Sequence, residues 1–177
     1  MKKTYIAIIA GLTVFGWGPG IKAQIQGPCA LLTTAEVQQA FPGSKPGQLD
    51  RRNEKHGLLT CMWDTPKGLL SIITGEEVNQ SPKDEAQGWT LTFLDPLRSD
   101  AERHVRYEVL TGVGDGAVAV VERQDKSKGF AQNGAILVVR RGKQQISVLS
   151  TELAHRERAD ALRIFAELGK AIAKRLN

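Results

Sequence analysis

The sequence contains only two cysteines and three histidines among its 177 residues. The histidines, His56, His104 and His155, lie far apart, and none has the i, i+4 spacing that places two metal ligands on one helix face. The cysteines are not in a C-x-x-C arrangement. These shortages argue against a metal centre and a redox dithiol, and we expect neither a metal nor another cofactor.

Catalytic motifs are missing as well. No G-x-S-x-G sequence is present to form the sharp turn that exposes a hydrolase serine. The adjacent acids Glu76-Glu77 and Asp84-Glu85 would point to opposite faces of a strand, which makes them poor acid–base pairs. We therefore predict a protein that is not an enzyme, and keep a small hydrolase as a less favoured alternative.

Long apolar runs are confined to the start of the chain. Residues 5–17 are almost wholly apolar, yet these 13 residues fall short of the about 20 that a membrane-spanning helix needs. Lys2 and Lys3 precede the run, and a Gly-Pro-Gly break and the small residue Ala23 follow it. This layout predicts a cleavable signal peptide over residues 1–23.

The mature chain is expected to begin at Gln24 and to form a single globular domain over residues 24–177. No second apolar run of comparable length follows, so we expect no stable membrane insertion after cleavage. Gln26-Gly27-Pro28 before Cys29 does not suit a lipoprotein cleavage site, which argues against a lipid anchor. The expected location is periplasmic or secreted.

A strong excess of positive charge is also absent from the mature chain. The full sequence has 24 basic and 19 acidic residues and a net charge of +5. The predicted signal peptide contains three of the lysines and no acid, so the mature part keeps a net charge of only +2. We expect no nucleic-acid partner. The basic pairs Arg51-Arg52, Arg140-Arg141 and Lys174-Arg175 are expected on solvated faces or helix ends.

The two cysteines that are present have a structural interpretation. Cys29 and Cys61 are the only pair in a chain expected to be exported, so we predict one disulfide between them. The competing interpretation, a redox-active or metal-binding pair, lacks the required spacing. Trp63 follows Cys61 closely and is expected in the core beside the disulfide.

Local patterns predict helices at both ends of the domain. Thr33 and Glu36 form a capping box that begins a helix over residues 34–41, and Ser81-Pro82 begins a second helix that reaches about residue 94. A clear apolar stripe at three- and four-residue spacing predicts a final helix. Its members are Ala161, Ile164, Phe165, Leu168, Ile172 and Leu176.

The segments between these helices have the character of strands, with turn residues between them. The predicted strands cover residues 58–63, 69–74, 105–110, 118–122, 135–141 and 144–150. The predicted fold class is therefore α+β, with a mainly antiparallel sheet covered by the N-terminal and C-terminal helices.

The most site-like segment contains alternating glycines: Gly112, Gly114 and Gly116 surround Val113 and Asp115. It lacks the Gly-Lys-Ser/Thr of a phosphate loop and precedes a strand, so no helix N-terminus would meet an anion. We predict a tight structural turn in which Asp115 accepts hydrogen bonds from backbone N–H groups. The alternative is a loop that contacts a ligand.

Two further aromatic residues allow two interpretations. Trp89 and Tyr107 are expected in the core; if either is exposed, it is the natural anchor for a protein or glycan ligand.

Several of these features together resemble a family of small secreted bacterial proteins whose function is not known and whose actinobacterial members are in many cases lipoproteins. The resemblance rests on the runs Pro-Cys-Ala-Leu-Leu-Thr at residues 28–33, Ala-Glu-Val at 35–37 and Cys-Met-Trp at 61–63, and on the glycine-rich turn. It implies a disulfide and a PsbP-like α/β/α sandwich, named after a photosystem accessory protein. It supplies no catalytic residues.

Three classes of function are compatible with this sequence. We favour an exported, non-catalytic binding or interaction module that recognises an envelope protein or a small ligand. An accessory or structural envelope protein is the first alternative, and an enzyme with convergent polar groups in a cleft is the second.

Overall fold

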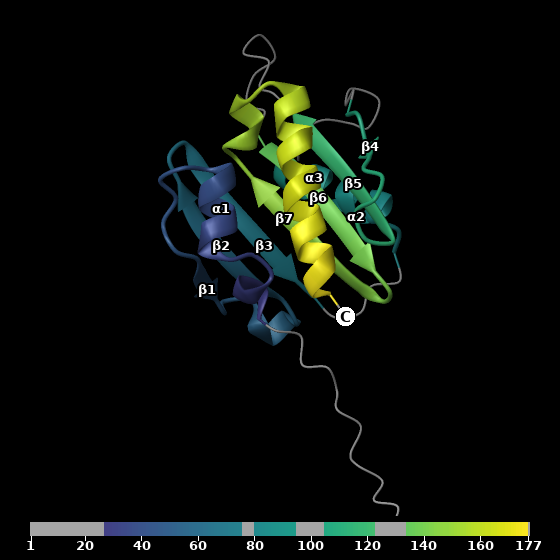
Figure 1. Cartoon of the computed structure of the whole chain (residues 1–177). Coiled ribbons are helices and arrows are strands. Elements are labelled where there is room, and N and C mark those ends of the chain that lie inside the picture. The colour runs from purple at the N-terminus through teal and green to yellow at the C-terminus, as the bar shows by residue number, and fades with distance from the viewer. Residues whose placement is uncertain (1–26, 76–79, 95–104, 123–133, 177) are drawn as a thin grey trace, which may run out of the picture.

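The computed structural model describes residues 27–75, 80–94, 105–122 and 134–176. They form one antiparallel sheet with helices on both faces, which confirms the predicted α+β class (Figure 1). The predicted signal peptide, Glu76, Glu77 and His104 lie outside these residues. The strands are β1 (Gln48–Asp50), β2 (Leu59–Thr65), β3 (Gly68–Thr74), β4 (Glu108–Val109), β5 (Gly116–Glu122), β6 (Gly134–Arg141) and β7 (Gln144–Ser150). The α-helices are α1 (Thr34–Ala40), α2 (Pro82–Trp89) and α3 (Arg158–Arg175).

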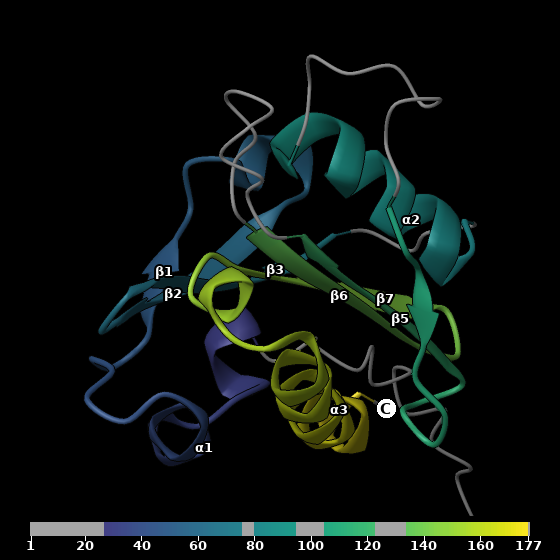
Figure 2. The same ribbon diagram turned by 90° about the horizontal axis from the view of Figure 1, so that it is seen from above.

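The sheet combines an early and a late part of the chain. Its strand order is β1-β2-β3-β7-β6-β5-β4, and every neighbouring pair is antiparallel. The two parts meet where β3 pairs with β7, from Leu70 opposite Ser150 to Thr74 opposite Ile146. Figure 2 shows α1 and α3 on one face of the sheet and α2 on the other. The protein is thus built of three layers.

Each face of the sheet has its own core. The larger core lies against α1 and α3 and contains the whole predicted apolar stripe of α3. The smaller core lies under α2 and contains Ala86 with alternate residues of β5 and β6. Because both faces of β5 and β6 are covered, these strands read as nearly continuous apolar runs. Among the described residues, no helix has both the length and the hydropathy needed to cross a membrane.

The predicted disulfide is confirmed. Cys29 lies in the 3-10 helix η1 (Pro28–Ala30) and is bonded to Cys61 of β2, 32 positions further along the chain. Cys61 and Trp63 are both buried in the larger core. The capping box before α1 is also confirmed, because the N–H of Glu36 donates to the hydroxyl of Thr33 and the N–H of Thr33 donates to the Glu36 carboxylate.

Three elements differ from the predictions. Strand β1 was not predicted at all, and the strand expected over residues 105–110 is limited to Glu108–Val109. The helix expected to reach residue 94 is α-helical only to Trp89 and continues as a π-helix, η3 (Thr90–Leu94). The hydroxyl groups of Thr90 and Thr92 donate to carbonyl oxygens four residues earlier, at 2.8 Å each. The Thr90 hydroxyl thus shares the Ala86 carbonyl oxygen with the Thr90 N–H at the point where the winding changes.

Candidate functional site

The glycine-rich segment forms the connection from β4 to β5. Gly112 and Gly114 have φ values of +72° and +57°, in the left-handed region that favours glycine. A Cβ atom on Gly114 would collide with the carbonyl oxygen of Arg140, whereas a Cβ on Gly112 would meet nothing within 4 Å. Gly114 is therefore required by close packing against β6, and Gly112 only by its backbone angle.

Asp115 ties this turn to the β6–β7 hairpin. Its N–H donates to the Arg140 carbonyl oxygen at 2.8 Å, and its Oδ2 accepts the N–H of Gly142 at 2.6 Å. Gly142 has φ +58° at the first position of a two-residue hairpin loop, as a type II′ turn requires. Asp115 thus accepts a backbone hydrogen bond from the neighbouring hairpin and not from its own turn.

The same turn lines an open pocket with a volume of about 380 Å³. We call this the cationic pocket, because the turn meets three positively charged side chains there. One comes from the end of β6 and two from the last turns of α3. Its lining residues are Gly112, Gly114, Asp115, Arg141, Lys170, Ala173 and Lys174.

Arg141 is held in place by the end of α3. Its Nη1 donates to the carbonyl oxygen of Ala173 at 2.8 Å. The last carbonyl groups of a helix have no partner within the helix, so this bond satisfies one of them and fixes the guanidinium group. A guanidinium has five N–H donors, and the others are available to the pocket.

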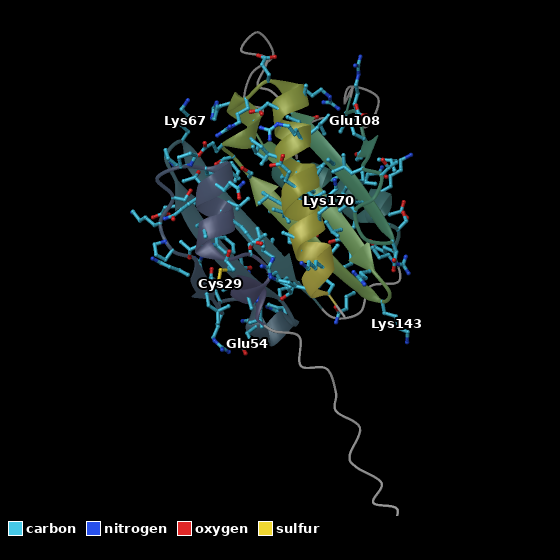
Figure 3. All side chains as sticks on the ribbon, in the orientation of Figure 1. Cys29, Glu54, Lys67, Glu108, Lys143 and Lys170 are labelled. Atoms are coloured by element: carbon cyan, nitrogen blue, oxygen red, sulfur yellow. A yellow bond between two sulfur atoms is a disulfide. The ribbon has the colours of Figure 1, made fainter. Side chains whose placement is uncertain are left out.

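Lys170 and Lys174 stand on one face of α3, separated by about one helical turn. Both are exposed, and within the described part of the chain neither forms an ion pair. Asp115 is the one acid that lines the pocket, so the formal charge of the pocket is +2. Figure 3 shows Lys170 on α3, over the sheet face that carries the larger core.

Comparisons with family models, curated proteins and solved structures find no match for this chain.

A second, smaller groove lies between α1 and α3 and has a volume of about 230 Å³. Its two acids are already paired: Glu36 with Arg175 and Glu167 with Arg163, both at 2.9 Å. This groove therefore lacks the uncompensated charge that distinguishes the cationic pocket.

The aromatic candidates lie elsewhere. Trp89 and Tyr107 are half-buried against the smaller core, on the α2 face of the sheet. The Trp89 indole N–H donates to Glu85 Oε1 and Ser147 Oγ, both at 2.7 Å, and the Lys83 ammonium lies 6.0 Å from the Tyr107 ring centre. The structure therefore does not bring these aromatics together with the glycine-rich turn.

The three cations of the pocket were visible in the sequence but were not recognised as part of a site. Arg141 belongs to a basic pair, and Lys170 and Lys174 follow the polar face of the last helix. Only the position of α3 on the sheet brings them to residues 112–115, and no local signal encodes that position. Within the described residues, no three His, Cys, Asp or Glu side chains are grouped closely enough to hold a metal ion.

Proposed function

We propose that this protein is an exported binding module that holds a small anionic ligand in the cationic pocket. The observation that carries the proposal is the meeting of Arg141, Lys170 and Lys174 at a pocket with a single carboxylate. Like charges that line one pocket repel one another unless a counter-charge joins them. An anion supplies that counter-charge.

Helix electrostatics alone do not require this arrangement. Lysines near the C-terminus of a helix are stabilised by its dipole by about 0.3–1 kcal/mol, with or without a ligand. The dipole does not, however, require Arg141 or an exposed glycine turn beside those lysines. Some other surface cations of the described residues are paired with acids, as in Lys45–Asp64 and Arg163–Glu167. The cationic pocket differs from single unpaired lysines in that it brings three cations to one carboxylate.

Export is the second part of the proposal. The basic, apolar and small-residue layout of residues 1–23 supports a cleavable signal peptide. The Cys29–Cys61 disulfide fits an oxidising compartment such as the periplasm. The resemblance to small secreted bacterial proteins with a PsbP-like fold points the same way. Intact-mass analysis of protein recovered outside the cytoplasm should give a chain that begins at Gln24 and has no alkylatable thiol before reduction.

Ligand binding is tested by thermal unfolding at constant ionic strength with inorganic phosphate, sulfate, acetate or citrate added. A ligand at about 100 times its Kd stabilises the native state by about 2.7 kcal/mol. We expect at least one of these anions to raise the Tm of the wild type, and the double variant Lys170→Gln/Lys174→Gln to lose the increase. The matched control is Lys55→Gln/Lys67→Gln, which removes the same charge outside the pocket.

The outcome separates the proposed function from its first alternative. A Tm increase that the control keeps and the pocket variant loses supports the anion-binding module. Equal responses of all three proteins, or no response to any anion, would contradict it and favour an accessory or structural envelope protein.

A further inference from the structure

We infer that the ligand of the cationic pocket carries a phosphate monoester, that is, a terminal phosphate group with two negative charges. This inference rests on the proposed function and narrows its ligand class. It follows from three features of the pocket: its net charge, its backbone donors and its open shape.

The charge of the pocket matches a dianion. Arg141, Lys170 and Lys174 face one carboxylate, that of Asp115, which leaves two positive charges uncompensated. A phosphate monoester carries about −1.5 to −2 charges at pH 7, whereas a carboxylate or a sulfate ester carries one. A single monoanion would leave part of the repulsion between the cations in place.

The backbone of the turn supplies donors suited to a tetrahedral anion. The N–H groups of Gly112 and Gly114 form no hydrogen bond within the described part of the chain. Positive φ at these two positions alternates with negative φ at Val113. Alternation of this kind turns successive N–H groups toward one side and forms the concave anion sites known as nests. A terminal phosphate has three free oxygens that can accept from the nest and the side chains together.

Arg141 can orient such a group, because its guanidinium is already held by the Ala173 carbonyl oxygen. A planar fork of fixed direction binds two phosphate oxygens at once, while lysine acts as a point charge from any direction. We therefore assign the two lysines the attraction of the dianion and Arg141 its orientation.

The open shape of the pocket indicates how much of the ligand is recognised. The lining residues come from a turn, a strand end and a helix end, and most are exposed. Such a pocket can hold a terminal group while the rest of the molecule stays in solvent. A soluble phosphate ester and the headgroup of a lipid phosphate monoester share this chemistry, and they are separated in the experiment below.

The test uses three ligands that differ only in the charged group: phenyl phosphate, phenyl sulfate and benzoate. Binding to the mature wild type is measured by isothermal titration calorimetry at about pH 7.5, where the phosphate, with a second pKa near 6, is a dianion. We expect phenyl phosphate to bind about tenfold more tightly than either monoanion. Arg141→Lys should keep binding but reduce this preference, because lysine retains the charge and lacks the fork.

The pH dependence gives an independent readout. Lowering the pH to about 5 protonates most of the phosphate, so its affinity should fall about tenfold while that of phenyl sulfate stays constant. The charged groups facing the ligand are Asp115, Arg141, Lys170 and Lys174. Asp115→Asn removes the carboxylate and keeps an oxygen that can accept the Gly142 N–H. If phenyl phosphate loses affinity at low pH in this variant as it does in the wild type, the titrating group is the ligand and not Asp115.

The two sources are distinguished by sedimentation with phosphatidylcholine vesicles containing phosphatidic acid, a monoester, or phosphatidylglycerol, a diester. Binding to phosphatidic acid vesicles alone assigns the site to a lipid, and binding to phenyl phosphate alone assigns it to a soluble ligand; either result supports the inference. Equal affinity for all three phenyl ligands would overturn the inference and leave the anion-binding function intact. Absence of binding by every anion would overturn both.

Discussion

At the scale of single residues, the two glycines of the turn look alike in sequence but differ in what surrounds them. Both have positive φ, yet only Gly114 packs directly against the backbone of β6. A side chain at Gly112 would be unfavourable only because of the positive φ angle. A side chain at Gly114 would have the same strain and would also collide with the Arg140 carbonyl oxygen.

This difference predicts unequal effects of the same substitution. Gly112→Ala should lower the free energy of unfolding by about 1 kcal/mol, the cost of the left-handed conformation for an L-residue. Gly114→Ala should lower it by about 3 kcal/mol, since strain and overpacking combine there. Urea unfolding of the two variants measures both values. Equal destabilisation would show that the packing of Gly114 on β6 does not constrain the turn.

Glu36 links the capping box of α1 to Arg175 of α3. Burial acts to raise its pKa, but hydrogen bonds from Thr33 and the Arg175 guanidinium outweigh burial and hold the pKa below its usual value of 4.5. A lowered folded-state pKa means that the carboxylate stabilises the fold above pH 4.5. This contribution disappears as the pH falls through the folded-state pKa.

Glu36→Gln tests this linkage, because glutamine can still accept the capping hydrogen bond while it loses the charge. At neutral pH, the free energy of unfolding of the variant should be about 0.5 kcal/mol lower than that of the wild type. The difference should vanish once the pH is low enough to protonate Glu36 in the folded protein. Urea unfolding across this pH range gives the comparison, and a difference that persists in acid would contradict an electrostatic origin.

At the scale of elements, two helical glycines serve opposite roles. Gly169 lies where α3 crosses the sheet, and a Cβ there would come within 2.7 Å of Val113 Cγ1 and 3.3 Å of Leu137 Cδ2. Gly88 is exposed in α2, and a Cβ atom there would have no neighbour within 4 Å. Gly169 allows α3 to lie close to the turn of the cationic pocket.

Alanine at these positions should change stability in opposite directions. Gly88→Ala should stabilise the protein by about 0.5–1 kcal/mol through helix propensity. Gly169→Ala gains the same propensity, but overpacking against buried Val113 costs about 1–3 kcal/mol, so a net loss of stability is expected. Thermal unfolding decides the sign of each effect. Stabilisation by Gly169→Ala would contradict the close approach of α3 to the turn.

The disulfide fixes the N-terminal segment to β2. Breaking a bridge between residues 32 positions apart should cost about 4 kcal/mol in the chain-entropy model. Cys29→Ala is expected to lower the free energy of unfolding by this order. The double variant Cys29→Ala/Cys61→Ala controls for the thiol left behind in the core. An unchanged urea midpoint in both variants would rule out a stabilising role for the bridge.

The elements that could be predicted from the sequence are those with a local cause. The capping box, the apolar stripe of α3 and the hairpin between β6 and β7 each depend on residues a few positions apart. Strand β1 has only three residues, and it pairs with Cys61 and the neighbours of Cys61 in β2. Three residues are too few to show the alternation of apolar and polar side chains that predicts a strand. The π-helical turn η3 continues the helix predicted over residues 81–94, and no residue pattern distinguishes its winding from that of an α-helix.

At the scale of the whole molecule, the candidate site is a product of topology. The glycine-rich turn was identified from its sequence, but its three cations come from segments about 30 and 60 positions further along the chain. They meet the turn because β5 pairs with β6 and because α3 returns across the same sheet face. Without knowledge of this topology, the sequence shows only a basic pair and the polar face of a helix, and it does not indicate a site.

The proposed function requires that an anion binds at this meeting point. The most direct measurement is the ¹⁵N–¹H correlation spectrum of the mature protein during titration with phenyl phosphate. The largest shifts should be those of the amides of Gly112, Gly114 and Gly142, with no shift for Gly88 on the opposite face. Saturable shifts confined to the α2 face, or none anywhere, would contradict anion binding at the cationic pocket.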